Sequence, residues 1–200
     1  MEKIDAVITW VDGAGPNYQR KLKKYLNDSN TIRKQYLQAN EICFCIASII
    51  KYAPFIRKIF VVTDNQTPDL NSIKDFIPLD RVVIIDHKNV FENYERFLPT
   101  FNIRSIDAVL HRIKGLSEKF IYFNDDMFLI KKTKPEDWFV GDKAVLTGNW
   151  VKSYNKKPIK MISQKIKSFF NMRPSYNASQ SKAANIAGFN SKYFKSYHCG

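Results

Sequence analysis

Four short apolar runs limit the folds that this chain of 200 residues can adopt. Each run is rich in Val, Ile and Phe, and each is continuous rather than alternating, which is typical of strands that are covered on both faces. The four runs are Ile4–Val11, Ile59–Thr63, Val82–Ile85 and Phe120–Phe123. Strands of this kind occur in sheets that carry helices on both sides, so the runs predict an α/β domain.

Segments with helical spacing lie between these runs. Glu41–Tyr52 places five apolar side chains on one stripe and is followed by Pro54, which ends a helix. Asn102–Ile113 repeats apolar residues at i, i+3 and i+4 and precedes Gly115, a plausible C-terminal stop. Alternating strands and helices predict a mainly parallel, Rossmann-like sheet. A further strand is expected over Ala144–Thr147.

The basic residues are unevenly distributed. From Lys143 onward there are 11 Lys and Arg and no Asp or Glu, whereas the first 142 residues carry 21 bases against 19 acids. A basic segment of this kind indicates an anionic partner, namely a phosphorylated glycan, a membrane surface or nucleic acid. The alternative is a solvated helix face without a partner.

Beyond Trp150 the pattern changes from strands to helices. Lys157–Asn171 has amphipathic spacing, and Asn177–Ala187 is a second candidate helix. We therefore expect an α/β domain over residues 1–150 and a basic helical extension without strands over residues 151–200.

Cysteine usage and hydropathy indicate a cytoplasmic protein. Cys43, Cys45 and Cys199 are few and odd in number, which predicts neither a disulfide framework nor a zinc site. The longest apolar run, Ile42–Ile50, is shorter than the roughly 20 residues of a membrane-spanning helix. The first residues lack the basic and apolar segments of a secretory signal. Peripheral contact of residues 151–200 with the inner face of the membrane is compatible with this expectation.

Acidic and amide side chains follow all four predicted strands. They are Asp12-Gly13, Asp64-Asn65, Asp86-His87 and Asn124-Asp125-Asp126. The carboxyl ends of parallel strands share one edge, where open α/β sheets bind their ligands. Carboxylates that gather there repel one another unless a hard cation is present, so the pattern predicts Mg²⁺ (or Mn²⁺). The alternative is that each Asp or Asn simply forms a turn after its strand.

Asp125 and Asp126 are the best candidates for metal ligands. Apolar residues flank the pair on both sides, in Phe120–Phe123 and Met127–Ile130. We therefore expect both carboxylates to be buried, which is costly without a compensating cation. A metal that bridges the two carboxylates to a diphosphate would offset this cost.

Several common chemistries lack their motifs. Neither kind of glycine-rich phosphate loop is present, and neither is Gly-x-Ser-x-Gly. His87, His111 and His198 do not have the spacing of metal ligands. A metal-bound diphosphate without a glycine-rich loop is typical of nucleotide-sugar transferases.

The segment Asp5–Gly13 (DAVITWVDG) resembles the first conserved segment of the Stealth family. This family includes bacterial capsular polysaccharide phosphotransferases and the animal N-acetylglucosamine-1-phosphotransferase. Pieces similar to its second conserved segment continue to about Phe139, so the resemblance covers roughly two thirds of the chain. The main pieces are Lys51-Tyr52-Ala53-Pro54, Val62–Pro68, Leu98–Asn102, Leu110–Ile113, Gly115–Tyr122 and Asn124-Asp125-Asp126.

The chain also departs from the family pattern. Cys43 and Ala47 stand where the family commonly has arginine. The family's third and fourth segments would follow the basic extension, and the sequence ends at Gly200, so it is expected to be truncated relative to the family. His198 is similar to the leading histidine of the third segment, which implies a proton acceptor for the attacking hydroxyl.

The resemblance implies transfer of a sugar-1-phosphate from a UDP-sugar, typically a UDP-hexosamine, to a hydroxyl of an anionic glycan. It places Asp125 and Asp126 on the metal as catalytic residues, together with His198. The residues implied in binding the substrate are Trp10, Asp12, Gly13, Asp64, Gln66, Asn102, His111, Arg112 and Asn124.

Other interpretations remain open at this point. Trp10 is equally suited to the core, His111 to ordinary packing, and Arg112 to a buried ion pair with Asp107 or a neighbour. The chain is alternatively an ordinary glycosyltransferase, or a truncated, inactive module that binds a nucleotide sugar or glycan. Nucleic acid is not an expected partner, because the predicted acidic edge would repel it.

Overall fold

The computed structural model describes residues 2–26, 39–152, 162, 176–189 and 192–196. The chain divides into two compact units, one ending at Phe139 and one running from Val140 to Cys199. In the part of the chain that is described, no helix has the length and hydropathy needed to cross a membrane.

The first unit alternates strands and helices along the chain. Its elements are β1 (Ile4–Thr9), α1 (Pro16–Leu26), α2 (Glu41–Tyr52), β2 (Ile56–Thr63), β3 (Val82–Asp86), α3 (His87–Val90), η2 (Glu95–Phe97), α4 (Ile103–Asp107), η3 (Leu110–Arg112), β4 (Lys119–Asn124) and η4 (Pro135–Asp137). The four predicted strands and the helix over Glu41–Tyr52 are thus confirmed. The helix α1 was not predicted from the sequence.

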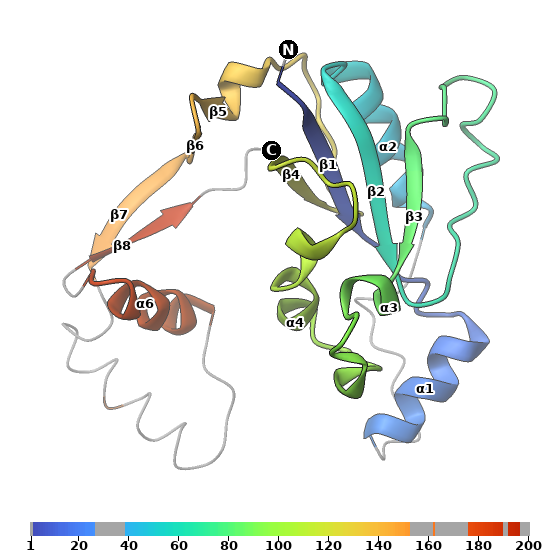
Figure 1. The fold of residues 1–200 in the computed structure, drawn as a ribbon, viewed down its shortest axis with the longest axis horizontal. Coiled ribbons are helices and arrows are strands. Elements are labelled where there is room, and N and C mark those ends of the chain that lie inside the picture. Colours follow the sequence, from blue (N-terminus) through green and yellow to red (C-terminus); the bar gives the residue numbers. More distant parts are fainter. Residues whose placement is uncertain (1, 27–38, 153–161, 163–175, 190–191, 197–200) are drawn as a thin grey trace. The chain divides into compact units, whose positions relative to one another are not determined.

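The four strands form one parallel sheet in the order β3-β2-β1-β4 (Figure 1). This confirms the predicted α/β class. The first strand lies in the interior of the sheet, and the chain runs from it to β2 on one side and reaches β4 on the other. Thr9, the last residue of β1, lies opposite Val62 of β2 and Asn124 of β4. The order of the strands reverses between β1 and β4, and such a switch point is where open α/β sheets bind ligands.

Both faces of the sheet are covered, as the continuous apolar runs predict. On one face α2 packs against the sheet through side chains that include Ile42, Ile46 and Ile49. On the other face α3, α4 and η3 contribute Val90, Ile106 and Leu110 (Figure 1). These side chains are almost fully buried, and each contributes roughly 1.5–3 kcal/mol by leaving water.

An ion pair between the buried carboxylate of Asp5 and the partly exposed Arg57 ties three segments together within the sheet domain. The carboxylate of Asp5, on β1, accepts hydrogen bonds from Arg57 Nε and NH2 at 2.9 and 2.5 Å. It also accepts from the backbone N–H groups of Lys58 at 3.1 Å and Ser117 at 2.7 Å. Arg57 in turn donates to the carbonyl of Gly115 at 2.7 Å. The Asp5 side chain has no exposed surface, yet each of its oxygens is bonded.

The predicted helix over Asn102–Ile113 is wrong in its length. It is divided into α4 and η3, because the chain tightens to i→i+3 hydrogen bonds from Val109 to Ile106 and from Ile113 to Leu110. The tighter winding still directs Ile106, Leu110 and Ile113 into the core. The apolar spacing therefore identified the buried residues but not the helix type.

The second unit corrects the expectation of an extension without strands. Its elements are β7 (Gly148–Lys152), α6 (Tyr176–Ile186) and β8 (Lys192–Ser196), and the short strands β5 (Phe139–Val140) and β6 (Lys143–Ala144) pair where the units meet in sequence. β7 and β8 pair antiparallel. The helix expected over Asn177–Ala187 is confirmed as α6, and the one expected over Lys157–Asn171 lies outside the described residues.

The strand expected over Ala144–Thr147 is also wrong. β6 ends at Ala144, and the next strand begins at Gly148, because pairing with β8 selects residues 148–152. Val145 and Leu146, which motivated the prediction, are 41% and 67% exposed. The compact units divide after Phe139, whereas the sequence placed the domain boundary at residue 150.

Candidate functional site

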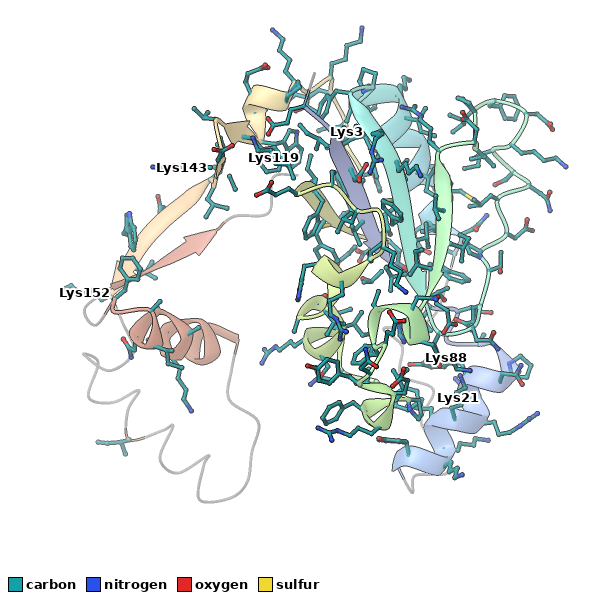
Figure 2. All side chains as sticks on the ribbon, viewed as in Figure 1. Lys3, Lys21, Lys88, Lys119, Lys143 and Lys152 are labelled. Carbon is teal, nitrogen blue, oxygen red and sulfur yellow. The ribbon has the colours of Figure 1, made fainter. Side chains whose placement is uncertain are left out.

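The residues that follow the strands lie along the carboxyl edge of the sheet. Figure 2 shows Lys21 and Lys88 at this end of the first unit and Lys3 and Lys119 at the opposite end. The loops after β1 and β4 begin at directly paired residues, Thr9 and Asn124. The parallel topology therefore brings the segments around Asp12 and Asp125 to the same part of the edge.

A side-chain clasp fixes the loop after β1. The amide of Gln66 accepts a hydrogen bond from the backbone N–H of Asp12 at 3.0 Å and donates to its carbonyl oxygen at 2.9 Å. The Asp12 carboxylate accepts from the N–H of Ala14 at 2.9 Å, which shapes the turn. A Cβ atom on Gly15 would lie 2.8 Å from Nε2 of Gln66, so the clasp needs glycine at this position. Both polar atoms of Gln66 are thus used in holding the loop.

Replacing Gln66 with Ala is expected to loosen this loop. The substitution removes two hydrogen bonds, each worth about 0.5–1.5 kcal/mol, so the Asp12 amide should exchange with solvent roughly tenfold faster. Hydrogen exchange followed by NMR measures the rate. Gln66→Glu keeps the acceptor and loses the donor, and it should give an intermediate rate. Thr67→Ala, an exposed change on the same loop, is the control, and an unchanged rate in Gln66→Ala would contradict the clasp.

Three polar side chains join the ends of β1 and β4. The phenol oxygen of Tyr122 lies 2.8 Å from Oγ1 of Thr9 and donates to Oδ1 of Asn124 at 2.9 Å. Tyr122 is 37% exposed although it lies within a strand. Burial, together with the nearby carboxylates of Asp107 and Asp125, raises the pKa of Tyr122 to about 12. The phenol is therefore neutral and keeps its hydrogen at physiological pH.

The expectation that Asp125 and Asp126 are both buried is wrong. Asp125 is half-buried and Asp126 is exposed. The apolar residues after them alternate: Leu129 bonds through its N–H to the hydroxyl of Ser48 on α2, whereas Phe128 and Ile130 are 52% and 68% exposed. Because alternate residues of this segment face water, the two carboxylates avoid most of the desolvation cost that the sequence predicted.

The carboxylates of Asp125 and Asp126 both lie close enough to the thiol of Cys45 for their charges to affect its pKa. Burial, then the charges of Asp125 and Asp126, raise the pKa of Cys45 to about 12. Both carboxylates are thus near the first turns of α2, where the Cys45 thiol donates to the carbonyl of Asn124 at 3.7 Å. The thiol remains protonated at physiological pH and is not a metal ligand in that form.

Two other acids at this edge, Asp64 and Asp86, have local partners. Lys21 of α1 binds both oxygens of Asp64, at 2.8 and 2.7 Å. Asp86 accepts from the N–H groups of Asn65 and Lys88, at 2.6 and 2.8 Å. Within the described ranges, no three His, Cys, Asp or Glu side chains gather as a metal cluster.

The sequence also predicted substrate-binding roles for Trp10, Gly13 and Asn102. Trp10 and Gly13 lie in the loop after β1: Trp10 packs partly against the α2-side core, and the carbonyl of Gly13 accepts from Gln19. Asn102 caps α4 by accepting from Arg104 N–H at 3.1 Å.

Two further residues occupy η3. His111 is exposed. Arg112 donates to the carbonyl of Glu92 at 2.6 Å and stacks 4.6 Å from the ring centroid of Tyr94, rather than pairing with Asp107 as the alternative proposed. Arg112 is thus held within residues 92–112. His198 lies outside the described residues.

Sequence reasoning missed Thr9, Lys21 and Tyr122. The helix that carries Lys21 could have been predicted, because Pro16 follows a glycine-containing turn and proline is typical of a first helical position. Tyr122 was read as one apolar residue of a strand, and only the register that opposes Thr9 to Asn124 reveals its role.

Comparisons with known proteins identify the family. Residues 35–147 match conserved region 2 of the Stealth proteins, and residues 2–30 match conserved region 1. The capsular polysaccharide phosphotransferase cps1A of Actinobacillus pleuropneumoniae is 39% identical over 145 residues, which are 68% of this chain and 38% of that protein. The receptor polysaccharide phosphotransferase WefC of Streptococcus oralis is 38% identical over 152 residues, 71% and 43% of the two chains.

A third relative is a longer protein, so the match covers a smaller share of it. The exopolysaccharide phosphotransferase SCO6023 of Streptomyces coelicolor is 38% identical over 149 residues, 72% of this chain and 24% of that protein. The chain thus spans less than half the length of these relatives, and the match covers the α/β unit and the loops after β1 and β4. The two conserved regions and the identity to these relatives show that the chain belongs to the Stealth family.

Proposed function

We propose that the α/β unit binds the diphosphate of a UDP-sugar, a UDP-hexosamine in particular, with Mg²⁺ (or Mn²⁺) at the ends of β1 and β4. In the whole protein, this site serves the transfer of a sugar-1-phosphate to a glycan hydroxyl in capsular or surface polysaccharide synthesis. The observation that carries the proposal is the location of Asp125 and Asp126 at the switch point of the sheet, beside the loop that Gln66 holds. The names of the relatives support phosphotransfer as the reaction.

The residues at the end of β4 fit a magnesium ion. Mg²⁺ is commonly bound through one or two carboxylates, with waters and substrate phosphates completing its octahedron. Two neighbouring carboxylates, one half-buried and one exposed, match that requirement better than a closed protein cage. Their accessibility leaves room for phosphate oxygens. We therefore propose Asp125 and Asp126 as the residues that hold the ion.

The chain's own residues then have distinct tasks. The bound metal would supply charge neutralisation at the diphosphate. The clasped loop around Asp12 and Gly13 would line the donor, and the side chain of Asn124 would face the phosphates. The acceptor oxygen forms a bond to the phosphorus nearest the sugar, while the bond from that phosphorus to the bridging oxygen breaks and UMP leaves. His198 is proposed to take the proton of the hydroxyl.

The basic residues of the C-terminal part support an anionic acceptor. From Lys143 onward the chain carries 11 bases and no acid, so it attracts a polymer that already contains phosphate. The same charge is compatible with peripheral contact with the inner face of the membrane, in a cytoplasmic protein. Both are proposals that rest on composition.

The test of the reaction is the nucleotide that is released. Sugar-phosphate transfer should yield UMP in an amount equal to the phosphodiester formed, whereas an ordinary glycosyltransferase yields UDP. Incubating the chain with UDP-N-acetylglucosamine, Mg²⁺ and a phosphate-containing glycan, followed by chromatography of the nucleotides, separates the two. Release of UDP would reject the proposal. Tight, Mg²⁺-dependent binding without release of either nucleotide would indicate a binding module.

A further inference from the structure

The side chain of Asn124 lies at the proposed site in a defined orientation. Its amide group has a carbonyl oxygen, which accepts hydrogen bonds, and an NH₂ group, which donates them. The two ends suit opposite partners, because a cation needs the oxygen and a phosphate needs the NH₂. The neighbour that occupies one end therefore decides which ligand the other end can take.

Tyr122 occupies the oxygen. Its phenol donates to Oδ1 of Asn124 at 2.9 Å, and the two residues lie on the same side of β4, two positions apart. A phenol has one hydrogen, so the 2.8 Å contact with Thr9 is a hydrogen bond donated by the Thr9 hydroxyl to the phenol oxygen. The chain of donors runs from Thr9 of β1 through Tyr122 to Asn124.

The hydrogen stays on Tyr122 throughout the physiological range. Burial raises the pKa of Tyr122 to about 12, with Asp107 and Asp125 adding to the effect. Asp107 on α4 also hydrogen-bonds to the phenol, which partly offsets the rise that burial causes in the pKa of Asp107, so the one phenol hydrogen is divided between Asp107 and Asn124. Loss of the phenol hydrogen would free the Asn124 amide to rotate.

We propose that Tyr122 is a positioning residue that orients Asn124 as a phosphate donor rather than a metal ligand. With Oδ1 bound to Tyr122, the NH₂ group of Asn124 is turned away from the phenol and presents two N–H donors beside Asp125. Phosphate oxygens accept such hydrogen bonds, while the neighbouring carboxylates bind the cation. The inference rests on the proposed function, in which a nucleotide diphosphate lies at the ends of β1 and β4.

A double-mutant cycle with UDP as the probe tests this inference. Tyr122→Phe keeps the ring and its packing and removes the hydroxyl, so the affinity for UDP in the presence of Mg²⁺ should fall three- to tenfold. Asn124→Ala should cause a larger loss. Because Tyr122 acts through Asn124, adding Tyr122→Phe to Asn124→Ala should cause no further loss. Titration calorimetry on the 200-residue chain measures all four affinities.

A spectroscopic readout separates orientation from folding. The side-chain NH₂ signals of Asn124, identified by their absence in Asn124→Asp, should shift when UDP and Mg²⁺ are added. In Tyr122→Phe this shift should be smaller, while thermal unfolding stays within about 2 °C of the parent. Tyr94→Phe makes the same chemical change at another exposed tyrosine and should alter neither readout.

The possible results separate a failure of the role of Tyr122 from a failure of the proposed function. Unchanged UDP affinity in Tyr122→Phe, or losses that add fully in the double variant, would overturn the role of Tyr122 while the site itself stands. If the parent chain binds no UDP with Mg²⁺, both the site and the inference fail.

Discussion

Replacing Asp126 with Ala is expected to abolish sugar-phosphate transfer and the part of UDP affinity that depends on Mg²⁺. A metal at a transferring phosphoryl group contributes several kcal/mol of charge stabilisation, so its loss should lower the rate about a thousandfold or more. Asp126 is exposed, and its removal leaves no cavity in the core, so the fold should be unaffected. Asp125→Ala should have a similar effect on transfer.

The measurement is a titration of Mg²⁺ at fixed UDP, which follows binding in this chain without requiring turnover. The parent should bind UDP more tightly as Mg²⁺ is added, whereas Asp126→Ala should show the same weak affinity throughout. Asp75→Ala removes another exposed carboxylate, far along the chain from β4, and serves as the control. Retention of the full Mg²⁺ effect in Asp126→Ala would reject Asp126 as a ligand.

The sheet was predictable because its interior strands, β1 and β2, are buried on both faces. Continuous apolar runs of this kind have few alternative structures, and their order with intervening helices favours parallel pairing. The same reasoning located the edge where acidic residues gather. It did not give the chemistry of that edge, because a sequence does not show which acid has a partner: Lys21 neutralises Asp64, and backbone amides occupy Asp86.

Long-range pairing explains what the sequence missed. β7 pairs with β8, which lies about 40 residues later in the chain. Nothing within residues 148–152 alone predicts a partner strand at 192–196. The link from Thr9 to Tyr122 likewise depends on register between strands that are more than a hundred positions apart. Burial at the end of β4 was misjudged because alternate residues after Asp126 turn outward, which apolar character alone does not reveal.

Replacing Arg57 with Met is expected to reduce the free energy of unfolding, because it leaves the Asp5 carboxylate buried without its counter-charge. Asp5 would keep its hydrogen bonds from the N–H groups of Lys58 and Ser117. Met fills much of the same volume, so the loss reports the charge rather than a cavity. Arg20→Met, at an exposed position on α1, is the control and should change stability by less than about 0.5 kcal/mol. Urea unfolding at pH 7 measures both.

The pH dependence of this loss identifies Asp5 as its source. Burial by itself raises the pKa of Asp5, but the hydrogen bonds from Arg57 and from Ser117, with the Arg57 charge, bring it below the ordinary 3.8. A carboxyl group with a lowered pKa stabilises the fold above its unfolded pKa, and this contribution is lost as the pH falls through the folded value. Without Arg57, burial dominates and the carboxyl is protonated more easily. The difference between the parent and Arg57→Met should therefore be largest near pH 7 and shrink as the pH falls toward 3. A difference that stays constant over that range would mean that packing around Arg57, and not the ion pair, stabilises this end of the sheet.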